Sequence, residues 1–205
     1  MNKGRFEAFS DGVFAFAITL LILGIVLPEF KNPPPSEAQL AHALVRLWPN
    51  LLAYAMSFAV IGIMWQHHHA LFRLVHHVDR STVYWNLVLL GVTAFIPFAT
   101  STLGAYPTMR PAAFLYGLTL TGSATAINLM LAHLVRSGAF APHVGRATIR
   151  QTIVAYRVAW TTYGIATVTA LAAPVLSFAL YLLIVVYFLI PRGVDTDLEG
   201  TPAQE

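Results

Sequence analysis

The sequence lacks cysteine entirely, and charged side chains are scarce. Asp, Glu, Lys and Arg make up 10% of the 205 residues, against about 25% in soluble domains. Without cysteine the chain forms no disulfide and no thiolate-bound metal site. Because 57% of the residues are hydrophobic and so few are charged, the chain cannot build the polar surface of a soluble domain. The composition therefore excludes a soluble enzyme and indicates an integral membrane protein.

Signals for catalysis and for nucleic-acid binding are also missing. The sequence holds no phosphate-binding loop, no Ser/His/Asp arrangement and no pair of carboxylates with catalytic spacing. Its net charge of +3 is small, and the basic residues follow membrane topology. We therefore expect no enzyme activity, no resident cofactor and no nucleic-acid partner.

Long apolar runs dominate the chain instead, and a bilayer-spanning helix needs about 20 such residues. The pattern predicts an all-α membrane protein with six transmembrane helices, at about residues 6–27, 49–69, 82–103, 112–135, 149–172 and 174–190. The proline-rich segment KNPPPSEA, residues 31–38, predicts a stiff linker. Residues 1–191 would form one membrane domain, and residues 192–205 a disordered cytoplasmic tail.

The basic residues alternate between the two sets of loops that six spans create. One set holds most of them, namely Lys3, Arg5, Arg73, Arg80, Arg136, Arg146, Arg150 and Arg192. The other set holds Lys31, Arg46 and Arg110. The positive-inside rule then places both termini in the cytoplasm.

An acidic residue, Asp11, lies just inside the first apolar segment, RFEAFSDGVFAFAITLLILGIVLP. Ionisable side chains in a membrane are costly and usually have a partner or a function. A helix-end charge near the headgroups, capped by Ser10, is one interpretation. The other is a buried partnership with Trp65 and His69, which lie four residues apart on one face of the second segment. An indole N–H and an imidazole can both hydrogen-bond a carboxylate.

Histidines are concentrated at the end of that second segment and just after it. Adjacent histidines on a helix point about 100° apart, so they do not converge on one ion. A polar patch at the membrane interface is one interpretation of His67, His68 and His69. His69 and His76 could share a helix edge and His77 adds another possible pair, but no carboxylate lies at ligand spacing, so we expect no metal site.

An apolar stripe at helical spacing follows Asp11. Its members are Phe16, Leu20, Leu23 and Leu27, and Thr19 lies beside them. Periodicity alone fits contact with lipid, a packed core or the lining of a pore.

The opening RFEAFSDG is similar to the Arg-x-x-x-Phe-Ser-Asp signature of the transmembrane protein 175 family. Arg5, Phe9, Ser10 and Asp11 match it. The family comprises the lysosomal potassium channel of animals and its bacterial homologues. Trp65 and His69 also resemble the end of its second helix. The chain resembles a bacterial member with one six-helix repeat.

The resemblance implies a homotetrameric channel in the bacterial plasma membrane, permeable to K⁺ and other monovalent cations. The first helix of each copy would line a central pore. In the family the signature Arg and Asp bond to the Trp and His of the second helix. Carried over, Arg5 and Asp11 would bond to His69 and Trp65, with Phe9 packed at the junction.

The resemblance further implies a hydrophobic gate, formed by a ring at the position of Phe16. The family usually has isoleucine there, so Phe16 or Leu20 could be the tightest layer. Leu23 and Leu27 would continue the lining. The chain has no TVGYG-type filter, so we expect modest K⁺ preference, with Thr19 as a contributing hydroxyl.

Two other functions compete with a channel. A proton-coupled cation transporter could use Asp11, His69 and Arg157, an arginine within the fifth predicted segment, as a relay. A membrane enzyme or a metal-binding redox protein could use the histidines, although no supporting motif accompanies them.

Overall fold

The structure is a computed structural model that describes residues 2–30 and 34–189. The predicted tail, residues 192–205, lies outside the described residues. Within them the chain forms seven α-helices and one short 3-10 helix. These are α1 (Lys3–Leu20), η1 (Leu21–Gly24), α2 (Glu37–Arg46), α3 (Trp48–Leu74), α4 (Arg80–Ala105), α5 (Arg110–Arg136), α6 (Arg146–Ala170) and α7 (Pro174–Leu189).

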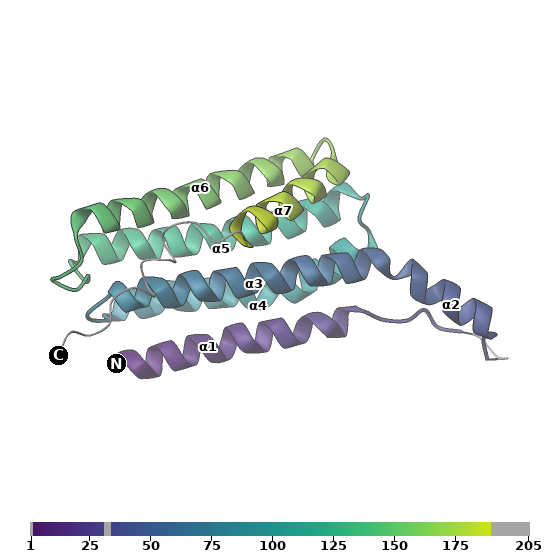
Figure 1. The fold of residues 1–205 in the computed structure, drawn as a ribbon, viewed down its shortest axis with the longest axis horizontal. Coiled ribbons are helices and arrows are strands. Elements are labelled where there is room, and N and C mark those ends of the chain that lie inside the picture. The colour runs from purple at the N-terminus through teal and green to yellow at the C-terminus, as the bar shows by residue number, and fades with distance from the viewer. Residues whose placement is uncertain (1, 31–33, 190–205) are drawn as a thin grey trace.

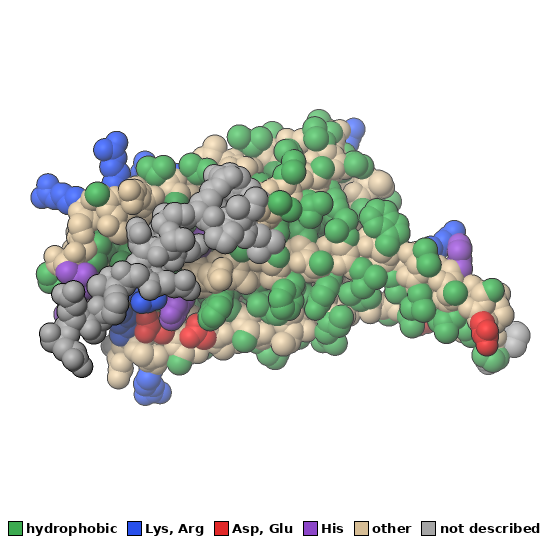
Figure 2. Space-filling model, in the orientation of Figure 1, with side chains coloured by type: hydrophobic (Ala, Val, Ile, Leu, Met, Phe, Trp, Pro, Cys, Tyr) green, Lys and Arg blue, Asp and Glu red, His purple; other side chains and the backbone are tan. Residues whose placement is uncertain are grey.

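The long helices lie side by side in an elongated bundle, and α2 projects beyond it (Figure 1). α1 forms one edge and packs against α3 and α4, while α6 forms the opposite edge and does not contact α1. The start of α1, the α3–α4 turn and the α5–α6 turn meet at one end of the bundle. We call this the basic end, since it carries Lys3, Arg5, Arg73, Arg80, Arg136, Arg146 and Arg150; most of the Lys and Arg side chains visible in Figure 2 project from it.

The prediction of six transmembrane helices is wrong. Four helical segments of the described chain are long and apolar enough to cross a membrane, namely Lys3–Gly24, α3, α4 and α5. α6 is not apolar enough to be counted among them, because it carries three arginines and is rich in threonine. α7 is apolar but has 16 residues, which reach only about 24 Å of a hydrocarbon core about 30 Å thick.

The sequence prediction also missed α2, which follows the proline-rich linker. Ser36 accepts a hydrogen bond from the Gln39 amide (3.3 Å), and the Gln39 side chain accepts one from the Ser36 amide (2.8 Å). This capping box fixes the start of the helix. A ten-residue helix with alternating polar and apolar positions gives no long apolar run, so a hydropathy search passes over it.

The first helix ends earlier than the predicted residue 27. The α-helix stops at Leu20, tightens into η1 and gives way to extended backbone at Ile25. Leu27 therefore lies beyond the helix and leaves the helical stripe that its spacing had suggested.

The core joins α1, α3, α4, α5, α6 and α7. At Gly117 on α5, α7 approaches very closely. A Cβ at that position would lie 2.5 Å from the Thr167 hydroxyl and would overlap the Tyr181 hydroxyl. Tyr181 is 1% exposed and stacks edge-on against Tyr116, so only glycine fits there without displacing α7.

Short backbone contacts link the turns at the basic end. The His76 amide donates to the Ala139 carbonyl (2.8 Å) and the Ala141 amide donates to the Leu74 carbonyl (2.9 Å). Lys3 adds the start of α1 by donating to the Val75 carbonyl (2.7 Å). The ends of α1, α3 and α5 are thereby held together.

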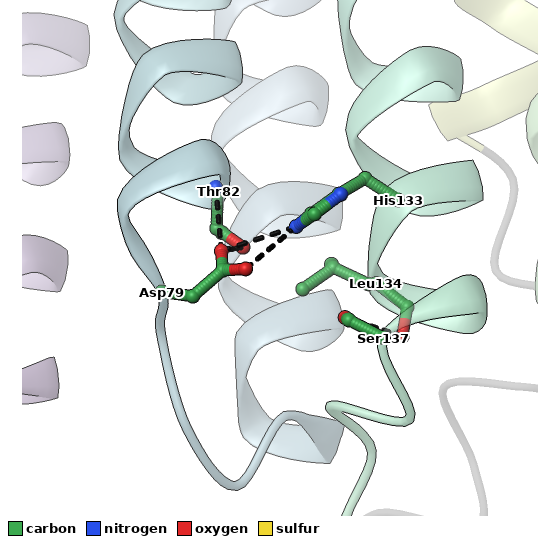
Figure 3. A network of polar contacts seen from close by, with 5 residues as sticks. All are labelled: Asp79, Thr82, His133, Leu134 and Ser137. Carbon is green, nitrogen blue, oxygen red and sulfur yellow. Dashed lines mark hydrogen bonds and ion pairs between the residues drawn. The ribbon is translucent and has the colours of Figure 1, made fainter.

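A polar network at the same end fixes α4 against α5 (Figure 3). Asp79 caps α4, accepting from the Thr82 amide (2.7 Å) and hydroxyl (2.6 Å). His133 on α5 lies 2.9 Å from the other carboxylate oxygen of Asp79. The Thr82 hydrogen bonds are the main cause that lowers the pKa of Asp79 from 3.8 to about 2, so this carboxyl is ionised at neutral pH.

We predict that Asp79→Ala lowers the free energy of unfolding at neutral pH by about 1 kcal/mol, because α4 loses its N-cap. Asp79→Asn should retain most of the stability, since an amide oxygen can still accept the capping bond. The pKa of Asp79 is depressed in the folded state, so its contribution is present above about pH 4 and is lost as the pH falls through about 2.

Denaturant unfolding of the detergent-solubilised protein, followed by circular dichroism at several pH values, measures this difference. An Asp79→Ala variant as stable as wild type at pH 7 would contradict the capping role.

Candidate pore helix and its polar anchors

α1 presents two faces with opposite environments. Phe6, Ser10, Phe14, Ala17 and Leu21 recur at helical spacing and are each at most 2% exposed. This face lies against α3 and α4. The remaining face is open in a single chain, so α1 is half core helix and half free surface.

The buried face of α1 is packed around the ring of His68 on α3. Phe6, Phe14 and Phe72 surround this imidazole, with ring centroids 6.2, 5.5 and 4.7 Å away respectively. His68 is 1% exposed. His68 is therefore a core residue and not part of a polar patch at the membrane interface.

Asn86 on α4 supplies the polar partners that these buried groups need. Its amide nitrogen donates to the Ser10 hydroxyl (2.9 Å), which in turn donates to the Phe6 carbonyl (3.0 Å). Its amide oxygen accepts from His68 Nε2 (2.9 Å). Ser10, His68 and Asn86 are each at most 1% exposed. Their hydrogen bonds therefore link α1, α3 and α4 in a part of the core that water does not reach.

The signature carboxylate, Asp11, points about 100° away from Ser10 around α1, at the margin of the buried face. Trp65 Nε1 donates to Asp11 Oδ1 at 2.8 Å. Asp11 is half-buried, Trp65 is 41% exposed and His69 stacks on the indole with centroids 6.1 Å apart. The sequence-predicted trio is thus in one place, although within a single chain only Trp65 hydrogen-bonds the carboxylate.

The other signature residues face outward. Arg5 is exposed and forms no ion pair with any described residue, and Phe9 is 53% exposed. In a single chain the structure does not bring Arg5 to His69 or Asp11.

The predicted stripe lies along the open face of α1. Phe16 is 65% exposed and Leu23 is 70% exposed, while Leu20 is half-buried. Thr19 is exposed and donates to the Phe16 carbonyl (2.8 Å), which leaves its oxygen lone pairs free to accept. A shallow groove runs beside this face, lined by Ala8, Phe9, Gly12, Val13, Phe16, Ala17, Leu20 and, from α4, Ala94.

The residues of the proposed proton relay do not meet. Asp11 and His69 lie near one another, but Arg157 lies on α6, at the edge of the bundle that α1 does not contact. Among residues 2–30 and 34–189, no three His, Asp or Glu side chains are arranged to hold a metal ion.

Sequence reasoning missed Asn86 and the buried position of His68. Asn86 carried a signal, because it is a polar amide inside an otherwise apolar membrane segment, VYWNLVLLG.

Proteins of known family and structure resemble this chain in both sequence and fold. Residues 5–97 match the family model of the endosomal/lysosomal potassium channel TMEM175, a range that includes Ser10, Asp11, Trp65, His68 and Asn86. A solved structure of a lysosomal potassium-selective channel TMEM175 homolog from Chamaesiphon minutus superposes with a TM-score of 0.82. It is 34% identical and covers 92% of this chain and 96% of that one. The fold is therefore that of a helical membrane channel.

Two relatives extend this result. A potassium channel of Streptomyces collinus is 39% identical over 92% of both chains. The human endosomal/lysosomal proton channel TMEM175 is 38% identical over 52% of this chain and 22% of its own length. The chain belongs to the TMEM175 family, which confirms the resemblance drawn from RFEAFSDG.

The amide at position 86 generates one prediction. Asn86→Leu should lower the free energy of unfolding by about 1–3 kcal/mol, since buried His68 loses its hydrogen bond to the amide and the buried Ser10 hydroxyl loses its donor. Adding His68→Leu should recover part of that loss, because one orphaned group is removed. Thermal unfolding of both variants measures this coupling; additive losses would contradict the network.

The carboxylate generates a second. Asp11→Ala should destabilise the protein by about 1 kcal/mol or more, because Trp65 loses its acceptor, and should impair assembly. Asp11→Asn keeps an acceptor oxygen and serves as the control. Size-exclusion chromatography and thermal unfolding in detergent are the measurements. An Asp11→Ala protein as stable and as well assembled as wild type would contradict the anchoring role of Asp11.

Proposed function

We propose that the chain is a K⁺-permeable cation channel whose pore is lined by the open face of α1 from several copies. Its relatives support this, since the Streptomyces protein and the Chamaesiphon protein are named as potassium channels. One helix cannot enclose a conduit, so the pore needs repeated copies around an axis. A homotetramer with closed symmetry meets that need.

The observation that carries the proposal is the unequal environment of α1. Three features hold its inner face, namely the Asn86 network, the Asp11–Trp65 bond and a packed row of apolar side chains. Its outer face carries Phe16 and Leu23 exposed in a single chain. A helix fixed in this way can present an apolar wall to a pore without collapsing into it.

Assembly would also employ the exposed signature residues. His69 is exposed beside Trp65, the partner of Asp11. Arg5 is exposed six residues before Asp11 on α1, and Phe9 borders the groove beside that helix. A neighbouring copy packed along this groove would cover Phe9 and bring further partners to the Asp11 carboxylate. The small residues in the groove, Ala8 and Gly12, allow close approach.

The mechanism we propose is a hydrophobic gate. A narrow ring of Phe16 or Leu20 side chains excludes water, and an ion cannot cross a dry apolar constriction. Widening the ring admits water and then hydrated or partly hydrated cations. Thr19 lies close to these positions, and its free oxygen lone pairs can contact a passing cation. Passive conduction needs no catalytic step and no cofactor.

Orientation follows from charge. The basic end would face the cytoplasm by the positive-inside rule, so the protein would lie in the bacterial plasma membrane with its N-terminus inside. The gate would then lie between the Asp11 anchor and the opposite face of the membrane.

Flux through purified protein in K⁺-loaded liposomes tests the proposal. A channel dissipates a K⁺ gradient without any pH gradient, whereas a coupled exchanger needs the second ion. The separation of Arg157 from Asp11 supports the channel over the relay. Strict dependence of K⁺ flux on a proton gradient would overturn the proposal.

We predict that Phe16→Asn raises basal K⁺ flux several-fold, because a polar ring stays wet. Val168→Asn on α6 is the matched control, since Val168 is 66% exposed and Phe16 is 65% exposed. The control should leave flux unchanged. Equal flux in wild type and both variants would mean that the Phe16 face contacts lipid.

A further inference from the structure

The edge of the bundle farthest from α1 has an unusual distribution of charge. α6 forms this edge and carries Arg146, Arg150 and Arg157. At 100° per residue, positions 146, 150 and 157 fall within about 40° of one another around the helix. The three guanidinium groups therefore form a stripe, which we call the arginine stripe, along one face of α6.

The arginine stripe is open to its surroundings. All three side chains are exposed, and among the described residues none forms a salt bridge or a hydrogen bond with any of the three guanidinium groups. The Thr161 hydroxyl donates only to the backbone carbonyl of Arg157. The opposite side of α6 makes the packing contacts, through Tyr156 and Tyr163 among others. Figure 2 shows basic side chains projecting outward where α6 begins.

The protein offers these arginines few counterions. Residues 80–189 include six arginines but no Asp or Glu. The nearest carboxylate in the preceding chain, Asp79, is already engaged by Thr82 and His133. Three clustered cations without an acid attract an external anion.

Position in the membrane identifies that anion. α6 starts at the basic end and continues along the outer edge of the bundle. In the orientation proposed above the basic end faces the cytoplasm, so the stripe would begin at the level of the headgroups. Arg157 lies eleven residues further, about 16 Å along the axis. Its side chain can extend back toward the headgroups.

We propose that the arginine stripe binds the phosphate headgroup of an anionic phospholipid from the leaflet at the basic end. Guanidinium groups suit this ligand, because each forms paired hydrogen bonds with two phosphate oxygens. Each bound headgroup supplies one negative charge to a helix that has three arginines and no acidic side chain. The site is on the opposite edge of the chain from α1, and its test does not depend on ion conduction.

The test measures lipid retention by the full-length protein. Wild type is reconstituted with phosphatidylcholine and a minor share of phosphatidylglycerol, and native mass spectrometry counts the lipids that remain bound. We expect selective retention of phosphatidylglycerol. Each arginine replaced by glutamine should weaken it by roughly fivefold, and lysine replacements should retain much of it because they preserve charge.

Arg110→Gln is the matched control, an exposed arginine at the start of α5 and at the other end of the bundle. It should retain phosphatidylglycerol as wild type does. Single variants such as Arg157→Gln keep the test valid if the triple variant fails to fold, which size-exclusion chromatography reports.

Three results would overturn the proposal. The first is equal phosphatidylglycerol retention by wild type and the arginine variants. The second is equal thermal stabilisation by inorganic phosphate in pure phosphatidylcholine, which would indicate a site for the free ion. The third is a wild type without selective retention that gains it when the tail carboxylates are neutralised (Asp195→Asn, Asp197→Asn, Glu199→Gln), which would make the tail the occupant.

Discussion

A single amide, that of Asn86, connects the polar groups on which the position of α1 depends. In a membrane protein a buried donor or acceptor cannot form a hydrogen bond with water, so it needs a partner within the protein. Asn86 donates to Ser10 and accepts from His68, which joins three helices at one point. The phenylalanines around His68 exclude water and keep these bonds short. The apolar open face of α1 can be left uncovered because the inner face is fixed in this way.

The charged contact of α1 is arranged differently from the neutral one. Ser10 faces the dry interior and meets neutral partners, while Asp11 faces the half-exposed side and accepts from Trp65. Burying the carboxylate would cost much more than burying the hydroxyl. Two consecutive residues of the signature thus serve different surfaces, Ser10 the fold of one chain and Asp11 the region where, in the proposed assembly, copies meet.

Sequence patterns predicted the membrane class, the family and the positions of the long apolar helices, because hydropathy and the RFEAFSDG signature are local. The number of spans was not predictable in the same way. The arginines of α6 and the shortness of α7 become decisive only when helix ends are known. The closeness of Trp65 to Asp11 followed from the family, whereas the role of Asn86 required knowing which helices pack together. The burial of His68 was not predictable, because the sequence alone does not show which of three consecutive histidines faces the core.

The hydrogen bonds from α1 side chains to other helices and turns all lie near one end, at Lys3, Ser10 and Asp11. Beyond Ala17 the helix tightens into η1 and its contacts are mainly apolar, apart from a long hydrogen bond (3.5 Å) from the Ser101 hydroxyl to the Gly24 carbonyl. Apolar surfaces slide over one another more easily than directional bonds stretch. The first three turns of α1 are therefore held by directional hydrogen bonds, while its last turns are held mainly by apolar packing. A lateral force on the bundle would bend α1 near Leu20 before it broke the hydrogen bonds of Lys3, Ser10 and Asp11. The helix is thus stiffer at its start than at its end.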